Sequence, residues 1–409
     1  MDDVRSFVRL VERSPMPDLW PDVASRRPGA FPPPAPPGRR ATAAVVALAV
    51  AAAGFVFVYE AVRPDDTAPI VETPTPSVEP LTGEPTITAE IAVPEGLTAY
   101  DVAVGAGAAW IALDEGIVDD GGGGWIGRID PTTNEIVAQI AVESSPYRDQ
   151  IAATDDAVWI ASGSVIERID PATNEIVARV ELGDRSAVSI AADATAVWAL
   201  AINTPSDDPR EWTGRLVRID PATNEIVADV PLGSHPVGYI DELRLGGGSV
   251  WVLGVLLPDP EGPEYGSDLI RVDPATNEIV ARIAVPGFHM AAGDDEVWVR
   301  YPEDGVVDSP GETWLWTRVD ASTNQPSSPF AFDGDDPGDG LILVTREALW
   351  SVGYDEQGAV RVTSFDPATL EVTAQSAPFN TQFHGAVVDA ATRTVWVATG
   401  ESMVRLDIA

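Results

Sequence analysis

Three histidines are the side chains of this sequence best suited to acid–base or metal chemistry. Imidazole changes charge near neutral pH and is a common metal ligand. His235, His289 and His384 each stand just before a short apolar segment that we expect to be an inner strand. Together with polar residues in corresponding zones, they are expected to surround one mouth of a central channel as a ligand-binding ring: Tyr100, Asp101, Arg148, Asp149, Arg185, His235, Glu242, His289, Asp339 and His384. A hydrated polar lining without a ligand is the structural alternative.

Three tryptophans could provide a second kind of binding surface. Trp125, Trp212 and Trp314 lie outside the position at which Trp recurs along the chain, and acidic loops lie beside them. An aromatic platform next to carboxylates can stack on a sugar or anchor a peptide. The alternative is that each ring packs under its own loop.

One acidic loop resembles a calcium-binding loop in composition. The segment 333–339 reads Asp-Gly-Asp-Asp-Pro-Gly-Asp, but Pro337 and Val344 occupy the fifth and twelfth ligand positions of a helix–loop–helix calcium site. No cofactor is therefore predicted, and calcium is the one ion left open. Four further loops are strongly acidic, which favours a basic partner or a solvated surface: 114–124, 203–213, 257–267 and 302–312.

The composition excludes several classes of function. The chain has 409 residues, a formal net charge of −39 and no Cys, and all 25 of its basic residues are Arg. So acidic a chain is not expected to bind nucleic acid, because phosphate binding needs basic clusters. Thiol chemistry and disulfides are impossible without Cys, and no G-x-S-x-G, H-E-x-x-H or phosphate-loop motif is present. Salt adaptation and biased genomic composition both remain open as reasons for the charge.

The elements that must position these residues are repeats. Arg-Ile-Asp-Pro-Ala-Thr-Asn-Glu-Ile-Val-Ala occurs at 168–178 and 218–228, close copies begin at Arg128 and Arg271, and weaker copies begin at Arg318 and Thr363. A Trp inside a short apolar segment recurs about every 48 residues, at positions 110, 159, 198, 251, 298, 350 and 396. Four short strands at this period predict an all-β, seven-bladed β-propeller over 86–409.

The repeat also predicts the strands and how the ring closes. In the second blade we expect strands at 150–153, 157–162, 165–170 and 175–182, with the Asp-Pro-Ala-Thr-Asn-Glu segment as a turn. The last blade ends without an outer strand, and 87–93 resembles an outer strand, so the N-terminal strand should complete it and remove the exposed edges. An Arg two residues before the turn Asp recurs in six blades, at 128, 168, 218, 271, 318 and 405, and predicts a ring of Arg–Asp pairs between blades.

The repeats resemble YVTN-type propellers, which are relatives of NHL-repeat propellers. The resemblance rests on the Val-Trp-Ile-Ala strand, on the Arg-Ile-Asp-Pro-Ala-Thr-Asn-Glu-Ile-Val-Ala segment and on the Gly or Pro that follows. It implies the fold but little about function, because such propellers serve as binding platforms, sensors and occasionally lyases. The sequence departs from the pattern at 325–329, where a clean outer strand is missing, and at Ser364, where Arg is expected.

The first 85 residues predict a tail, a membrane span and a linker. Residues 1–40 form the tail, an uncharged run within 41–62 is long enough to cross a bilayer as one helix, and 63–85 is a linker rich in Pro and Thr. Arg26, Arg27, Arg39 and Arg40 precede the span, which predicts a cytoplasmic N-terminus and a propeller outside the cell membrane. Cleavage near 51–53 as a signal peptide is the alternative.

Three functions follow as hypotheses. The first is a non-enzymatic binding, scaffold or sensor domain for a protein, peptide or glycan. The second is a lyase-like or metal-dependent enzyme at the channel mouth, which would need a converged pair such as His289 and His384. The third is transmembrane signalling through the tail, because Pro17-Asp-Leu-Trp-Pro21 weakly resembles tails of membrane-bound sigma-factor regulators, although their zinc-binding His and Cys are absent.

Overall fold

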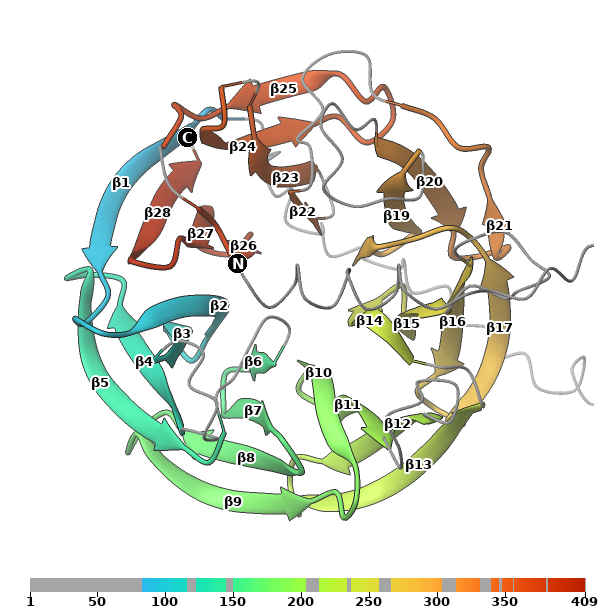
Figure 1. Cartoon of the computed structure of the whole chain (residues 1–409), viewed down its shortest axis with the longest axis horizontal. Coiled ribbons are helices and arrows are strands. Elements are labelled where there is room, and N and C mark those ends of the chain that lie inside the picture. The colour runs from blue at the N-terminus through green and yellow to red at the C-terminus, as the bar shows by residue number, and fades with distance from the viewer. Residues whose placement is uncertain are drawn as a thin grey trace, which may run out of the picture. The chain divides into compact units, whose positions relative to one another are not determined.

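Seven antiparallel four-stranded sheets form a β-propeller (Figure 1). A computed structural model describes residues 83–115, 123–144, 150–203, 213–233, 237–256, 266–303, 314–331, 340–345, 348–355, 357–379 and 382–408. Within these residues every element is a strand, and none is a helix that could cross a membrane. The chain divides into two compact units, 1–77 and 78–409, and the propeller belongs to the second. The predicted tail, span and most of the linker lie outside the described residues.

The strands of each blade are given from the channel outward. Blade 1 contains β2 (Thr98–Gly105), β3 (Ala108–Asp114), β4 (Gly124–Asp130) and β5 (Glu135–Val142). Blade 2 contains β6 (Ile151–Ala153), β7 (Val158–Ser162), β8 (Val165–Asp170) and β9 (Glu175–Glu181). Blade 3 contains β10 (Ser186–Ala192), β11 (Val197–Asn203), β12 (Thr213–Asp220) and β13 (Glu225–Gly233). Blade 4 contains β14 (Val237–Gly246), β15 (Ser249–Leu256), β16 (Gly266–Asp273) and β17 (Glu278–Ala284).

The remaining blades depart more from the repeat. Blade 5 contains β18 (His289–Ala292), β19 (Glu296–Pro302), β20 (Trp314–Asp320) and a short outer strand, β21 (Gln325–Pro326). Blade 6 contains β22 (Leu341–Val344), β23 (Leu349–Tyr354), β24 (Val360–Phe365) and β25 (Val372–Gln375). Blade 7 contains β26 (Gly385–Asp389), β27 (Thr394–Ala398), β28 (Ser402–Ile408) and, as its outer strand, β1 (Pro85–Ala92).

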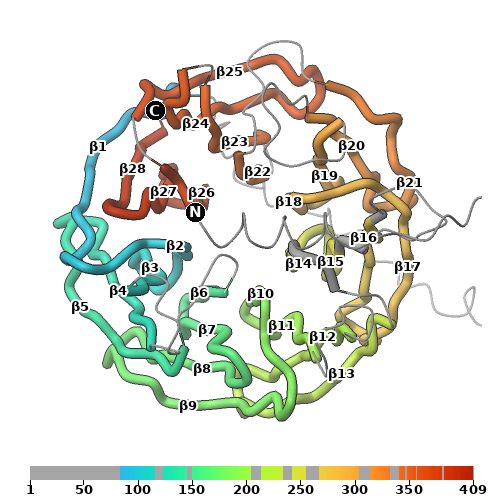
Figure 2. Tube along the Cα trace, viewed as in Figure 1, coloured from blue at the N-terminus to red at the C-terminus, as the bar shows by residue number. Residues whose placement is uncertain are grey.

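The predicted closure is confirmed. Strand β1 pairs antiparallel with β28 from Pro85 opposite Ile408 to Ala92 opposite Ser402. Figure 2 shows β1, in blue, beside β28, in red, so the first and last strands of the propeller share this blade. The blade 2 strands match their predicted bounds to within one residue. The missing outer strand predicted at 325–329 corresponds to β21, which has only two residues.

The core is divided among the interfaces between neighbouring blades, which we call seams. Each hydrophobic cluster of the described residues joins two adjacent blades, because both faces of a blade are apolar and each needs a neighbour. The repeated Trp lies at the centre of each seam and is at most 2% exposed in every blade. Each Trp side chain buries roughly 150–250 Å² of surface, so the seven repeated Trp residues account for much of the hydrophobic stabilisation.

The Asp-Pro-x-x-Asn turn has the geometry that its residues predict. In blade 2 the Asp170 carboxylate accepts the Ala172 N–H at 2.8 Å, and the Asn174 N–H reaches the Asp170 carbonyl at 2.8 Å. Asn174 has φ of 58°, in the left-handed region that Asn tolerates. The carboxylate is therefore used inside its own turn, and the Asn side chain remains available.

Neighbouring blades are joined by an Arg–Asn clamp rather than by the predicted Arg–Asp ring. Arg168 lies over Trp159 of its own blade at 5.3 Å and donates to the Pro221 carbonyl and to Asn224 Oδ1 of the next blade at 2.9 and 3.0 Å. The prediction of Asp as partner was wrong because the turn's own N–H groups occupy that carboxylate. The same Arg–Asn contact, at 2.9–3.2 Å, joins 128 to 174, 168 to 224, 218 to 277, 271 to 324 and 405 to 134.

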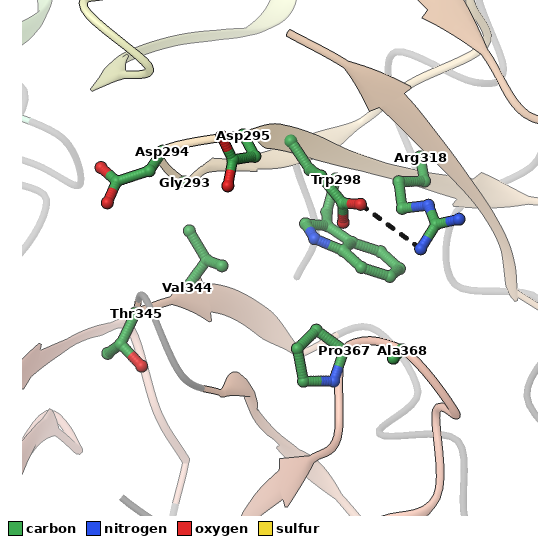
Figure 3. A pocket seen from close by; sticks show the side chains of 10 residues that line it. Gly293, Asp294, Asp295, Trp298, Arg318, Val344, Thr345, Pro367 and Ala368 are labelled. Atoms are coloured by element: carbon green, nitrogen blue, oxygen red, sulfur yellow. Dashed lines mark ion pairs between the residues drawn. The ribbon is translucent and has the colours of Figure 1, made fainter. Parts of the chain in front are cut away.

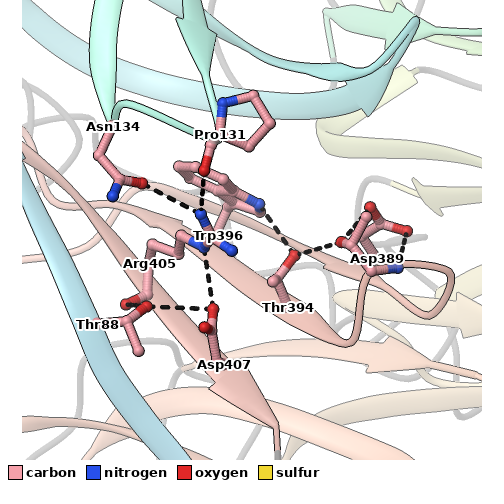
Figure 4. A network of polar contacts seen from close by, with 9 residues as sticks. Thr88, Pro131, Asn134, Asp389, Thr394, Trp396, Arg405 and Asp407 are labelled. Carbon is pink, nitrogen blue, oxygen red and sulfur yellow. Dashed lines mark hydrogen bonds and ion pairs between the residues drawn. The ribbon is translucent and has the colours of Figure 1, made fainter.

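The clamp of Arg405 also secures the closing blade (Figure 4). Arg405 stacks on Trp396, donates to the Pro131 carbonyl and Asn134 of blade 1, and pairs with Asp407 at 2.9 Å. The hydroxyl of Thr88 on β1 donates to Asp407 at 3.1 Å. The N-terminal strand is therefore bound to the residues that clamp blade 7 to blade 1.

Replacing one clamp amide should weaken the ring measurably. Asn174→Gly keeps a residue that accepts positive φ but removes the side-chain acceptor of Arg128 and leaves the Pro171 carbonyl, so the free energy of unfolding should fall by about 1–2 kcal/mol. Urea denaturation measures the loss. Ala172→Gly in the same exposed turn controls for glycine flexibility and should cost less. Equal losses in the two variants would contradict a role for the amide.

Candidate functional site

A band of polar residues lies at one level of the inner strands. The register of each inner strand against its Trp places Asp101, Gln150, Ser189, Glu242 and His289 at equivalent positions, two residues before the partner of the Trp. We call these five residues the polar band. Asp101, Glu242 and His289 were predicted from the sequence, and Gln150 and Ser189 were missed. Counting back from the repeated Trp would have found both.

Glu242 and His289 form the strongest contact of the polar band. They lie on β14 and β18, and His289 Nδ1 is 2.8 Å from Glu242 Oε1. The second carboxylate oxygen accepts the Met290 N–H at 2.6 Å and lies 3.6 Å from Arg244 Nη2. Burial alone would raise the pKa of Glu242, but Arg244, His289 and the Met290 N–H outweigh it and lower that pKa to about 2. Glu242 is therefore a buried carboxylate that is ionised at neutral pH.

Aromatic and cationic groups continue this cluster into blade 5. The His289 ring stacks on Trp314 with centroids 6.3 Å apart, and the guanidinium of Arg300 lies 4.5 Å from Trp314 and 5.7 Å from Trp316. Trp314 is 1% exposed and Arg300 is fully buried. The ring of Trp314, which was predicted as an external platform, is thus occupied by contacts inside the protein.

A second group of predicted residues meets between blades 7 and 1. The rings of Tyr100 and His384 lie 5.1 Å apart, and Asp101 is buried and accepts the N–H of Val102. A Cβ at Gly385 would lie 2.8 Å from the Asp101 Cα, so glycine allows this close approach. His384 and His289 therefore have different partners in different seams and do not contact each other in the way that the enzyme hypothesis requires.

The other predicted residues have varied places. Arg185 points to the outer strand of blade 3, where it pairs with Asp229 at 2.9 Å. Trp125 is half-buried against the cluster between blades 7 and 1. The structure does not describe the remaining predicted residues, which are Arg148, Asp149, Trp212, His235 and Asp339.

Beyond the polar band the central channel is apolar. Its cavity of about 330 Å³ is lined by Ala, Val, Ile and Leu from all seven inner strands, and Asp101 and Arg244 are its charged lining residues. Small apolar side chains favour an apolar guest or a dry interior over ion passage.

The polar band links neighbouring blades. Glu242 holds two groups of blade 5, and Gln150 donates to the Ala187 carbonyl of blade 3 at 3.4 Å. A structural role is therefore present beside any binding role. Among the described residues no group of three His, Asp or Glu side chains could hold a metal ion, and the acidic loop 333–339, where calcium was left open, lies outside them.

Comparisons with known proteins support the fold. No protein-family model and no curated protein sequence matches the chain. Among solved structures, Kuenenia stuttgartiensis hydrazine synthase is similar with a TM-score of 0.56 and 10% identity over 76% of this chain and 96% of that chain. The Neurospora crassa Pan2 WD40 domain is similar with a TM-score of 0.52 and 10% identity over 76% and 89%. At this identity the likeness establishes the propeller fold and nothing about chemistry.

Removing the buried charge of Glu242 should weaken the protein in a pH-dependent way. Because its folded-state pKa lies below the ordinary value of 4.5, ionised Glu242 stabilises the fold above pH 4.5, and this contribution disappears as pH falls toward 2. Glu242→Gln should cost roughly 3 kcal/mol at pH 7 and little near pH 2. Urea midpoints of both proteins across this pH range measure the difference.

The matched control is Glu175→Gln, which removes an exposed carboxylate from the start of an outer strand. It should change the free energy of unfolding by less than about 0.5 kcal/mol at every pH. A cost of Glu242→Gln that did not vary with pH would contradict the assignment of Glu242 as the ionised partner of His289 and Arg244.

Proposed function

We propose that this chain is a non-enzymatic binding or sensor protein that presents its propeller outside the cell membrane on one transmembrane helix. The finer assignment to the YVTN type is part of the proposal and rests on the repeated Val-Trp and Asp-Pro-Ala-Thr-Asn segments. The propeller would bind a protein, peptide or glycan, and its negative charge favours a basic partner.

The observation that supports this proposal is the difference between the two faces of the ring. The third and outer strands are joined by short turns of similar length: 131–134, 171–174, 221–224, 274–277, 321–324 and 366–371. On the opposite face the second and third strands are joined by segments as different as 163–164 and 303–313. Variable connections on a rigid scaffold are typical of binding surfaces.

The variable face also collects charge and the polar band. The long connections 115–123, 204–212, 257–265 and 303–313 contain many Asp and Glu and only one basic residue, Arg210. The inner strands begin on this same face, so the polar band lies toward these connections, and Asp101 is the member of the band that lines the channel. A basic peptide held by the connections would therefore have Asp101 as the acidic residue of the polar band that lines the channel.

The proposal predicts that binding of a cationic peptide depends on the face from which charge is removed. The test variant of the full-length chain carries Asp119→Asn, Asp208→Asn, Glu261→Gln and Asp308→Asn, one in each long connection. Fluorescence anisotropy with labelled octa-arginine should show about tenfold weaker binding than wild type at low salt, and a smaller difference at high salt.

A matched variant removes the same number of charges from the opposite side of the blades. Glu135→Gln, Glu175→Gln, Glu225→Gln and Glu278→Gln change the exposed first residues of four outer strands. Its affinity for the peptide should stay within about twofold of wild type. Equal losses in both variants would mean that the peptide responds to net charge alone, and the proposed binding face would be rejected.

A further inference from the structure

One seam of the ring lacks the clamp although its Arg is present. In blade 5, Arg318 still lies over Trp298 at 5.8 Å. The turn of blade 6 that it faces has Leu370 where five other turns have Asn, and Leu370 keeps the left-handed φ of 62°. Arg318 pairs instead with Glu296 of its own blade at 3.4 Å. The charge of Arg318 is therefore balanced within blade 5 and no longer joins blade 5 to blade 6.

Glu296 is itself a departure from the repeat. The position two residues before the Trp has a small residue in the other six blades: Ala108, Ala157, Ala196, Ser249, Ala348 and Thr394. Burial raises the pKa of Glu296, and the nearby Asp295 and Asp320 add to this effect against the opposing influence of Arg318. Two substitutions in one seam, at 296 and 370, thus change an inter-blade clamp into an ion pair within a blade.

The neighbouring seam also lacks the clamp, but it has no turn for an Arg to reach. Blade 7 takes its outer strand β1 from the N-terminus, so no turn joins its third and outer strands. Ser364 in place of Arg therefore loses nothing there. The cluster between blades 6 and 7 is also extensive, because Phe379 and Phe383 from the connection between these blades add to it.

The seam between blades 5 and 6 has a buried polar group in place of apolar packing. Leu349 belongs to its cluster, and Ser351, two residues along β23, faces the same side. Ser351 is fully buried, and its hydroxyl has no hydrogen-bond partner among the described residues. The equivalent residues of the other blades are all apolar: Ile111, Ile160, Ala199, Val252, Val299 and Val397. A buried hydroxyl without a partner destabilises the interface that contains it.

The apolar core of this seam is also small. A cavity of about 240 Å³ lies between Trp298 and Arg318 on blade 5 and Val344 and Pro367 on blade 6 (Figure 3). A cavity of about 310 Å³ lies at the equivalent place between blades 7 and 1, beside Trp396, so the cavity alone does not distinguish the two seams. Among the described residues, the buried core of the seam between blades 5 and 6 is smaller than that of any other seam. It comprises only Ala291, Trp298, Trp316, Ile342, Leu349 and Phe365. The seam between blades 5 and 6 therefore lacks the clamp, contains a buried hydroxyl without a partner among the described residues, and has the smallest described core.

We propose that the propeller ring opens at the seam between blades 5 and 6, and not at blade 7, where the chain ends close it. Local opening is governed by the interface with the least burial and the fewest bonds. The closing blade retains the Arg405 clamp and the full pairing of β1 with β28.

The absence of Cys allows a direct test by thiol labelling of the full-length chain. Ser351→Cys places a reporter in the proposed seam, and Ala199→Cys places one at the equivalent buried position between blades 2 and 3. Both sites are fully buried, so a thiol reagent reacts only after opening. The thiol at position 351 should react at least about tenfold faster, a difference of about 1.4 kcal/mol in opening free energy, and with little dependence on low urea concentrations.

Two further variants change the clamp itself. Leu370→Asn restores an acceptor for Arg318, so it should slow labelling at position 351 several-fold and leave position 199 unchanged. Asn224→Leu removes the side-chain acceptor of Arg168 and leaves the Pro221 carbonyl, so it should speed labelling at position 199. If Ser351→Cys fails to fold, Leu349→Cys faces the same seam, with Val197→Cys as its control.

Three results would overturn the proposal. Equal labelling rates with equal urea dependence would mean that both sites react only after global unfolding. Faster labelling of Ile111→Cys, in the seam between blades 7 and 1, would move the opening to the closing blade. Unchanged labelling at position 351 in the Leu370→Asn background would show that the missing clamp does not control the opening.

Discussion

The propeller depends on one repeated contact, in which the guanidinium group of an Arg on one blade donates hydrogen bonds to a turn of the next blade. A blade has two apolar faces and cannot bury either without a neighbour. Stacking on the Trp of its own blade fixes the position of the Arg guanidinium. The Asn in the turn of the next blade, which has a left-handed backbone conformation, accepts its hydrogen bond. The distances in the five clamped seams agree within 0.3 Å, from 2.9 to 3.2 Å. A chain without Cys thus joins its blades by packing and by one repeated charged hydrogen bond.

This contact explains why the two faces of the ring differ. The turn between the third and outer strands must supply a carbonyl and an amide oxygen to the preceding blade, so its length and its Asp-Pro-x-x-Asn sequence cannot vary freely. The connections between the second and third strands, on the other face, do not supply these acceptors. Differences in length and charge therefore accumulate there, beside the polar band, without disturbing the seams.

Much of the fold could be predicted because it repeats. The Trp interval gave seven blades, the second repeat gave strand bounds, and the incomplete last blade gave the closure by an N-terminal strand, which was predicted at 87–93 and lies at Pro85–Ala92. The partner of the Arg was predicted wrongly, since Asp and Asn both recur, and the structure shows that the turn's N–H groups occupy the Asp while the Asn side chain accepts from the Arg. The Glu242–His289 contact spans two blades, so it becomes predictable only when both strands are aligned on their Trp residues.

A closed ring makes a single altered seam more important than its share of the core. The stability of a repeat array is approximately the sum of its units and of the interfaces between nearest neighbours. Opening one seam leaves the other six interfaces intact, so the easiest opening is set by the weakest seam and not by the average. Strong clamps elsewhere therefore do not protect blades 5 and 6. Leu370, Glu296 and Ser351 act on the same interface, and together they determine where the ring yields first.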